Sequence, residues 1–309
     1  MTLKEYLQKK YSKSTLNSNL YNIKKFTDYY QNKAEKATYK DVLNYIEHLR
    51  KNYDLNPKTL CHCLSAVKIY FNYLLEIGKR KDHTCSELYL KDKINKQIQV
   101  DNLYSSETLE QFFENYQIKR KKYLQNRNKI MISLLIYQGL TVNEITELEL
   151  KDIDLDKGEI FIKGKQEITS KSPKSRTLPL QAKQVLLIYN YLEKDRKKLL
   201  KYNRKNPNDT RFVLGQYGEA IQPHGISRII NENRKENEKI QPLKIRQSVI
   251  ANLLKKENDT RIVQVFAGHK RASTTVQYKQ SELEILQRAI HQYHPIKEAV
   301  KPKSPKTKG

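Results

Sequence analysis

Hydrophobic residues recur at helical spacing through the first eighty residues of the chain, with polar residues between them. One stripe, in "STLNSNLYNIKKFTDYYQN", consists of Leu16, Leu20, Ile23 and Phe26. A second stripe, in "ATYKDVLNYIEHLRK", consists of Val42, Tyr45, Ile46 and Leu49. Thr38 fits the N-cap of this second helix, and Asn56 followed by Pro57 fits the start of a third helix that stops at Gly78. The pattern predicts a bundle of at least three helices over residues 1–82.

The periodicity then fades, and charged residues dominate a segment that we expect to be a linker over residues 83–103. A second domain is expected over residues 104–296. In it, "SSETLEQFFENY" and "RNKIMISLLIYQG" predict helices, the latter buried because it is nearly all apolar. "GEIFIKGKQEITSKSPKSRTLPL" alternates as two strands joined by a long basic turn. Four or five helices should follow, before a disordered basic tail over residues 297–309.

The predicted fold class is therefore mainly α with a small antiparallel β-sheet, in two domains. Fifty-nine Lys and Arg stand against thirty-four Asp and Glu, a net charge of +25 that favours a polyanionic partner, DNA or RNA. The alternative is that an AT-rich coding genome supplies the lysine regardless of function. Lysines on the outer faces of the bundle are the candidate DNA contacts there: Lys24, Lys25, Lys58 and Lys68.

The cysteine content and the hydropathy of the chain limit the cellular compartment in which we expect the protein. Three cysteines form no disulfide framework and suggest a reducing compartment, and "CHC" at 61–63 lacks the spacing of a zinc site because helix neighbours two apart do not share a face. No apolar run approaches membrane length, and no signal peptide is recognisable. We expect a cytoplasmic, nucleoid-associated protein without a metal or other cofactor.

Two segments carry the most specific signal. In "IRQSVIANLLKKENDTRIVQVFAGHKRASTTVQY", Arg246 precedes Gly268-His269, and Tyr278 lies nine residues after His269. Earlier, "LLIYQGLTVNEITELELKDIDLDKGEIFI" combines a buried helix, a Gly-Leu turn, a short helix and a hairpin. Together they resemble the tyrosine recombinase (phage integrase) family, and the N-terminal bundle resembles the family's helical, SAM-like core-binding domain. The resemblance covers nearly the whole chain.

This resemblance implies roles for individual residues. Tyr278 would attack a DNA phosphodiester to give a 3′-phosphotyrosine and a free 5′ hydroxyl, with Arg246 and His269 donating to the phosphate. Guanidinium suits this task because it presents a permanent fork of donors. A hairpin lysine would protonate the leaving oxygen, and both Lys171 and Lys165 are candidates. A second 5′ end could reverse the step without ATP or a metal ion. The alternative for Tyr278 is that it is one of 21 ordinary tyrosines.

Two positions depart from the family pattern. Thr141 stands where the first of two phosphate-binding arginines is expected, and Leu243 stands where the family usually has a histidine. "TVNE" reads as a capping box, so we expect Glu144 to cap a helix rather than to act in catalysis. Loss of one preorganised donor slows such chemistry by roughly a hundred- to a thousandfold. Neighbouring cations could substitute or bind the DNA backbone: Lys244, Lys270 and Arg271.

The sequence thus favours a site-specific recombinase or integrase of a mobile element, acting on double-stranded DNA as a homotetramer, with accessory DNA-bending proteins as possible partners. A helix around residues 283–290 would dock on a neighbouring subunit or on its own domain. Three other interpretations remain open. They are an inactive DNA-binding protein of the same fold, a type IB topoisomerase, and a generic basic protein.

Overall fold

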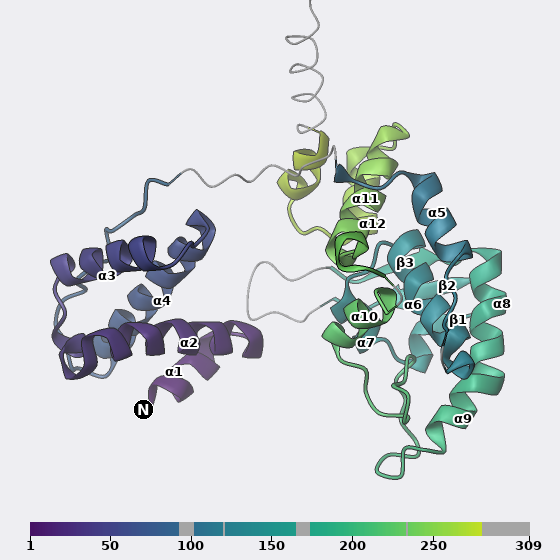
Figure 1. The fold of residues 1–309 in the computed structure, drawn as a ribbon, viewed down its shortest axis with the longest axis horizontal. Helices are drawn as coiled ribbons and strands as arrows, with labels where there is room; N and C mark the ends of the chain where they lie inside the picture. Colours follow the sequence, from purple (N-terminus) through teal and green to yellow (C-terminus); the bar gives the residue numbers. More distant parts are fainter. Residues whose placement is uncertain (93–101, 120, 165–173, 233, 280–309) are drawn as a thin grey trace, which may run out of the picture. The chain divides into compact units, whose positions relative to one another are not determined.

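The structure is a computed structural model that describes residues 1–92, 102–119, 121–164, 174–232 and 234–279. The chain folds into two compact units (Figure 1). The described part of the first unit is residues 1–92, and that of the second begins at residue 102. Helices dominate, and the described strands form one antiparallel sheet, which confirms the predicted fold class.

The first unit is a helical bundle. Its helices are α1 (Leu3–Lys10), α2 (Lys13–Tyr30), α3 (Tyr39–Asn52) and α4 (Pro57–Glu76), with the short helix η1 (Gln31–Lys36) after α2. The three predicted helices correspond to α2, α3 and α4, and both predicted stripes face the core, with Leu20 only half-buried. The sequence pattern did not predict α1, a helix of eight residues that buries only Tyr6 and Leu7.

Capping side chains lie at the starts of α3 and α4, at the positions that the sequence predicted. The Thr38 hydroxyl accepts a hydrogen bond from the Asp41 amide, and the Asp41 carboxylate accepts one from the Thr38 amide at 2.8 Å. The Asn56 side chain accepts from the Lys58 amide at 2.9 Å, immediately before Pro57. Each cap satisfies backbone donors that the first helical turn leaves unpaired.

The segment after α4 packs on the first unit. Cys85 and Leu88 are 1% and 5% exposed and belong to its core. The Arg80 guanidinium donates to the Glu35 and Ala37 carbonyls at 2.9 and 3.1 Å. The start of the predicted linker thus packs on the first unit as an irregular segment, which has no periodicity to reveal it. Residues 93–101 lie outside the described residues.

The second unit is built around the buried helix α6 (Gln125–Tyr137), as the apolar run predicted. Figure 1 shows it among the helices that pack against it, which are α5 (Ser106–Glu114), α8 (Ala182–Asn190), α10 (Pro223–Ile230) and α11 (Pro242–Lys255). The smaller elements are α7 (Val142–Glu147), η3 (Lys122–Leu124), η4 (Leu150–Asp152), the π-helical turn η5 (Tyr191–Arg196), α9 (Lys197–Leu200), η6 (Glu236–Glu238) and α12 (Thr260–Ala267).

The sheet has the strand order β1-β2-β3, with β1 (Ile153–Asp154), β2 (Glu159–Ile162) and β3 (Arg176–Pro179). The predicted hairpin is β2 and β3, in which Ile160 pairs with Leu178 and Ile162 with Arg176. Alternate residues of β3 are buried, so Arg176 shares the buried face with Leu178. Residues 165–173 of the basic turn lie outside the described residues.

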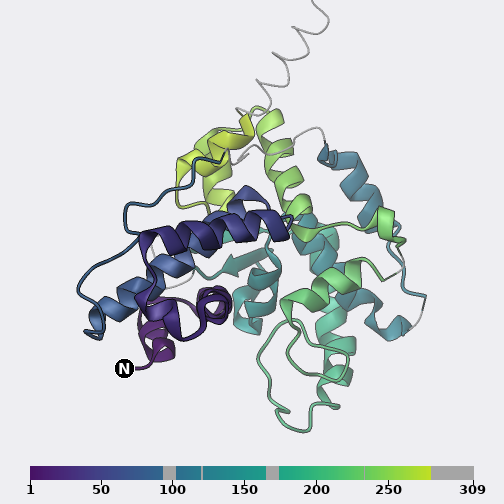
Figure 2. The ribbon, with the colours of Figure 1, turned by 60° about the vertical axis from the view of Figure 1, so that its left-hand side comes forward.

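Helices α11 and α12 lie side by side in both views of the ribbon (Figures 1 and 2). Gly268 ends α12 in the left-handed conformation, at φ +64°, and residues 272–279 form a further helical segment that carries Tyr278. The helix predicted around residues 283–290 and the tail at 297–309 lie outside the described residues. Among the residues described, no helix has the length and apolar content needed to span a bilayer.

Candidate active site

Arg246 connects the two signature segments of the second unit. It lies on α11, is 8% exposed, and donates from Nη1 to the Gly139 carbonyl at 2.5 Å and from Nη2 to the Ala267 carbonyl. Gly139 belongs to the turn after α6, and Ala267 is the last residue of α12. One guanidinium therefore fixes the ends of two helices that lie far apart in the sequence.

Glu144 sits beside this arginine and joins two guanidinium groups. Its Oε2 accepts hydrogen bonds from the Thr141 amide and hydroxyl at 2.8 and 3.0 Å, which confirms the predicted capping box. The same oxygen lies 3.9 Å from Arg246 Nη1, and Oε1 accepts from Arg176 Nη1 at 2.7 Å. Burial alone would raise the pKa of Glu144, but Arg176, the Thr141 amide and Arg246 together hold that pKa below its usual value. The carboxylate is ionised and acts as more than a cap.

Arg176 was not among the predicted site residues. Its side chain is 2% exposed, and it enters the site from the buried face of β3. It also lies against Gly268, where an added Cβ would be 2.6 Å from Arg176 Nη1. The glycine of the Gly-His pair is thus required twice, for its positive φ and for the approach of this guanidinium. A charged residue at a buried position of an alternating strand was the signal in the sequence.

His269 follows Gly268, and its Nδ1 lies 2.9 Å from the buried hydroxyl of Thr275. Burial, followed by the positive charges of Arg246 and Arg176, lowers the pKa of His269 to about 4, against a smaller opposing effect of Glu144. The imidazole is therefore neutral at pH 7. When Nδ1 accepts a hydrogen bond from the Thr275 hydroxyl, the ring proton resides on Nε2, which is then a hydrogen-bond donor.

Tyr278 is 7% exposed and packs in a small apolar cluster formed mainly by α11 and α12. Its ring centroid lies 6.5 Å from that of His269, and the two rings are nearly parallel at 16°. Burial raises the pKa of the Tyr278 hydroxyl, and the charge of Arg246 opposes this only in part. The phenol is therefore protonated at neutral pH and needs a base before it can act as a nucleophile.

The other predicted residues of this unit lie within three residues of Arg246 or His269 in the sequence, or outside the described part. Lys165 and Lys171, the two candidate acids, fall within residues 165–173 and are not described. Leu243 is 62% exposed in the first turn of α11, and the neighbouring Lys244 ammonium lies 4.6 Å from the centroid of the Tyr104 ring. Lys270 and Arg271, which directly follow His269, are half-buried and exposed, respectively.

The lysines predicted to contact DNA in the first unit differ in their surroundings. Lys24 and Lys58 are exposed, while Lys25 lies over the rings of two tyrosines. Lys68 donates to the Ser86 carbonyl at 2.7 Å and lies 4.0 Å from the centroid of the Tyr89 ring, so it also holds the segment after α4 in place. All four stay predictions as DNA contacts.

No group of three or more His, Cys, Asp or Glu side chains is arranged to hold a metal within the described ranges. His83, near the "CHC" segment, uses its ring nitrogens on backbone groups, with Nε2 3.0 Å from the Lys68 carbonyl oxygen and Nδ1 accepting from the Cys85 amide. Burial raises the pKa of the Cys85 thiol to about 11, which disfavours the thiolate that metals bind.

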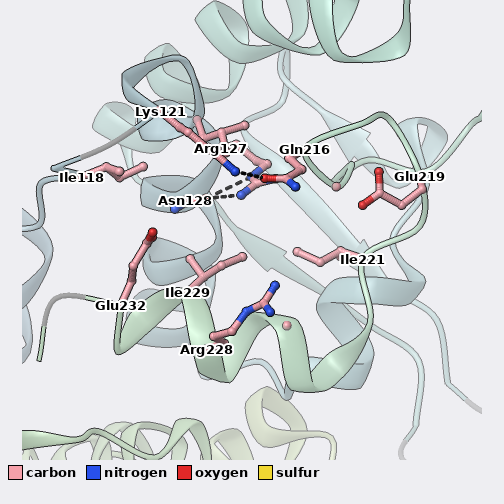
Figure 3. A pocket seen from close by; sticks show the side chains of 13 residues that line it. Ile118, Lys121, Arg127, Asn128, Gln216, Glu219, Ile221, Arg228, Ile229 and Glu232 are labelled. Atoms are coloured by element: carbon pink, nitrogen blue, oxygen red, sulfur yellow. Dashed lines mark hydrogen bonds between the residues drawn. The ribbon is translucent and has the colours of Figure 1, made fainter. Parts of the chain in front are cut away.

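A cavity of about 400 Å³ lies elsewhere in the second unit, between α6, α10 and the loop at residues 215–221 (Figure 3). One of its lining residues, Arg127, donates from Nε and Nη2 to the Asn128 side-chain oxygen and from Nη1 to the Leu214 carbonyl. The cavity shares no lining residue with the candidate site, and each guanidinium nitrogen of Arg127 already donates to a protein oxygen.

The fold and the site together define a two-unit protein whose second unit gathers arginines, a histidine and a tyrosine suited to phosphate chemistry. Residues 104–284 match the phage integrase family, and residues 2–78 match the N-terminal SAM-like domain of phage integrases. The chain belongs to the phage integrase family.

Relatives of this family resemble the chain along nearly its full length. It is 27% identical over 304 residues to tyrosine recombinase XerC of Oceanobacillus iheyensis, covering 95% of each chain. It is 24% identical over 296 residues to tyrosine recombinase XerC of Staphylococcus epidermidis, covering 94% of each.

Solved structures share the fold at lower sequence identity. XerH recombinase bound to its difH substrate in a pre-cleavage complex superposes with a TM-score of 0.64 at 23% identity, covering 90% of this chain and 79% of that one. The Tn1549 transposon integrase in complex with transposon right end DNA gives a TM-score of 0.60 at 15% identity, covering 94% and 99%.

Proposed function

We propose that this protein is a site-specific DNA recombinase that cleaves and rejoins double-stranded DNA through a 3′-phosphotyrosine intermediate. The observation that carries the proposal is the convergence of Arg246, His269 and Tyr278 from α11, the turn after α12 and the helical segment that follows. The relatives named as tyrosine recombinases support it, as do neighbours in the same fold that hold DNA.

The geometry suggests how each residue contributes. The Tyr278 oxygen attacks the phosphorus, a P–O bond to tyrosine forms, and the bond to the 5′ oxygen breaks. The Tyr278 proton passes to a base, because burial keeps the hydroxyl protonated beforehand. Arg246 and the Nε2 proton of His269 stabilise the charge that develops on the non-bridging oxygens. A hairpin lysine, Lys171 or Lys165, protonates the leaving 5′ oxygen.

The reaction conserves the energy of the phosphodiester in the phosphotyrosine bond. A 5′ hydroxyl from a second duplex can therefore attack the intermediate and complete strand exchange without an external energy source. In this proposal four copies assemble on two DNA sites, with DNA-bending proteins as helpers, and the chain moves or maintains a mobile element. Its place is the nucleoid of a bacterial cytoplasm.

A recombination assay tests the proposal. DNA sites are first selected from random duplexes by binding to the protein, and two labelled duplexes that carry a selected site are then incubated with it, in EDTA and without ATP. We expect recombinant duplexes whose strands join within the site. Bound DNA that is never exchanged would point instead to a DNA-binding protein that has lost catalysis, and exchange that requires ATP would contradict the mechanism.

A further inference from the structure

Arg176 is a buried arginine with unused donors. Only Nη1 of its guanidinium is bonded, to Glu144, whereas Nε and Nη2 are buried and have no hydrogen-bond partner among the residues that the structure describes. Buried polar groups are almost always paired, since an unmade hydrogen bond carries the full penalty of desolvation. These nitrogens are therefore available to an acceptor that lies outside the described residues.

Arg127 in the same unit shows what a structural arginine looks like. It is similarly buried: the whole residue is 3% exposed, against 5% for the whole of Arg176. Each of its three guanidinium nitrogens donates to an oxygen of the protein, and Figure 3 shows the two bonds to Asn128. The fold can thus give each nitrogen of an interior guanidinium a partner, whereas two nitrogens of Arg176 have none among the described residues.

That position is the candidate active site. The Glu144 carboxylate that binds Arg176 also lies beside Arg246 and accepts from Thr141, the residue found where the family pattern has its first arginine. Arg176 also adjoins Gly268, the residue before His269, and the Lys174 amide donates to the Gly268 carbonyl at 3.4 Å. Arg176 of β3 and Thr141 thus share the Glu144 carboxylate as a hydrogen-bond acceptor.

We propose that Arg176 is a catalytic residue of this enzyme, whose Nε and Nη2 bind the scissile phosphate in place of the arginine absent at position 141. This inference rests on the proposed recombinase function. Two guanidinium groups facing one carboxylate leave a net positive charge, which matches a phosphodiester with one negative charge and stabilises further charge in the transition state. Strand β3 holds the Arg176 guanidinium in position before DNA binds, so little reorganisation is needed.

The test compares cleavage of two nicked suicide duplexes that carry a site bound by the wild-type protein. One has an ordinary scissile phosphate, and the other has an uncharged methylphosphonate there. Arg176→Met should slow formation of the covalent protein–DNA complex roughly a hundred- to a thousandfold on the phosphate, as expected for loss of one preorganised donor. The loss should be at least tenfold smaller on the methylphosphonate, because that substrate has no anionic oxygen to bind.

Arg127→Met is the matched control for removing a buried arginine of the same unit. It should lower the melting temperature, but any change in cleavage should be equal on the two substrates. An equal loss on both substrates for Arg176→Met would overturn the proposal and make Arg176 a structural residue. Wild-type cleavage by Arg176→Met would overturn it too.

A second variant covers failure of the first to fold. Arg176→Lys retains a positive charge for Glu144 but lacks the forked donors, so it should cleave the phosphate at least tenfold more slowly than wild type when the protein saturates the DNA. Cleavage at the wild-type rate by this variant would refute the assignment. Absence of any covalent complex with the wild-type protein on DNA that it binds would instead refute the recombinase function itself.

Discussion

Glu144 shows how one side chain can cap a helix and compensate buried positive charge together. Its carboxylate caps α7 through Thr141 and at the same time neutralises one of two adjacent guanidinium groups. Without that negative charge, Arg176 and Arg246 would repel each other in a buried setting where such charges are poorly screened. The capping box is thus also the means by which the positive charges of the site are held together.

His269 leads to a prediction about pH. Its pKa is about 4 in the folded chain, below the ordinary value of 6.5, so between these values the unfolded chain binds the additional proton. The stability contributed by the neutral imidazole is complete above about pH 6.5 and is lost as the pH falls toward 4. The free energy of unfolding of His269→Gln should therefore fall less than that of the wild-type protein as the pH is lowered from 6.5 toward 4. Urea unfolding from pH 7.5 to 4.5 measures it.

His62→Gln, at an exposed position of α4, is the control for changing a histidine at the surface. Its free energy of unfolding is measured over the same pH range. If His269→Gln shows the same pH dependence of unfolding as the wild-type protein, the pKa of His269 does not differ between the folded and the unfolded chain. The neutral imidazole proposed for phosphate binding then loses its support.

At the scale of elements, the site depends on how helices end. Gly268 terminates α12 at φ +64°, and Gly158 adopts the same φ in the turn between β1 and β2. Alanine at either position must pay about 1–2 kcal/mol for the left-handed conformation. At Gly158 the added Cβ meets nothing within 4 Å, whereas at Gly268 it also collides with the Arg176 guanidinium.

Gly268→Ala should therefore lower the free energy of unfolding by clearly more than Gly158→Ala does. It should also slow DNA cleavage, because Arg176 has to move, while Gly158→Ala should cleave at the wild-type rate. Chemical denaturation and the covalent-complex assay measure the two effects. Equal destabilisation by the two substitutions, with equal cleavage, would show that Arg176 does not lie against Gly268.

The sequence predicted those helices whose starts are marked by local capping residues. Thr38, Asn56 and Thr141 mark helix starts through contacts within one turn, so the sequence alone located these caps. Strand β1 has only two residues, and the segment after α4 has no period at all, so neither could be recognised from its pattern. Their positions follow from pairing and packing with distant residues.

The candidate site was predictable only in part for the same reason. Arg246, His269 and Tyr278 were found through a spaced motif, and the structure brings them together in one unit. Arg176 was missed because its role depends on strand register and on contact with Glu144, 32 residues away in the sequence. No spacing rule links those two positions, and only the folded hairpin brings them into contact.

For the whole molecule, the net charge of +25 predicts strongly salt-dependent DNA binding. Each phosphate neutralised by a lysine or arginine contributes about −0.9 to the slope of log Kobs against log salt concentration. We expect a slope steeper than about −5, and a decrease of about 1 in its magnitude for each of Lys24→Gln and Lys58→Gln, at exposed positions. Binding titrations between about 50 and 200 mM salt measure this slope.

Lys10→Gln provides the control for these surface changes. Lys10 lies 2.5 Å from a Glu76 carboxylate oxygen, so its charge is already compensated within the protein. It should leave the slope close to that of the wild type. A shallow slope for the wild-type chain, or slopes for Lys24→Gln and Lys58→Gln that match Lys10→Gln, would contradict the proposed role of these lysines.

The central claim is that Tyr278 becomes covalently joined to the 3′ side of the cleaved strand. The most direct measurement uses nicked suicide duplexes that carry a bound site, with wild-type protein and Tyr278→Phe compared on denaturing gels after equal DNA binding is established. We expect a covalent band for the wild type, with the peptide that contains Tyr278 attached to a 3′ phosphate, and none for Tyr278→Phe. A covalent band that survives in Tyr278→Phe, or a wild-type protein that binds its site without forming one, would contradict the account.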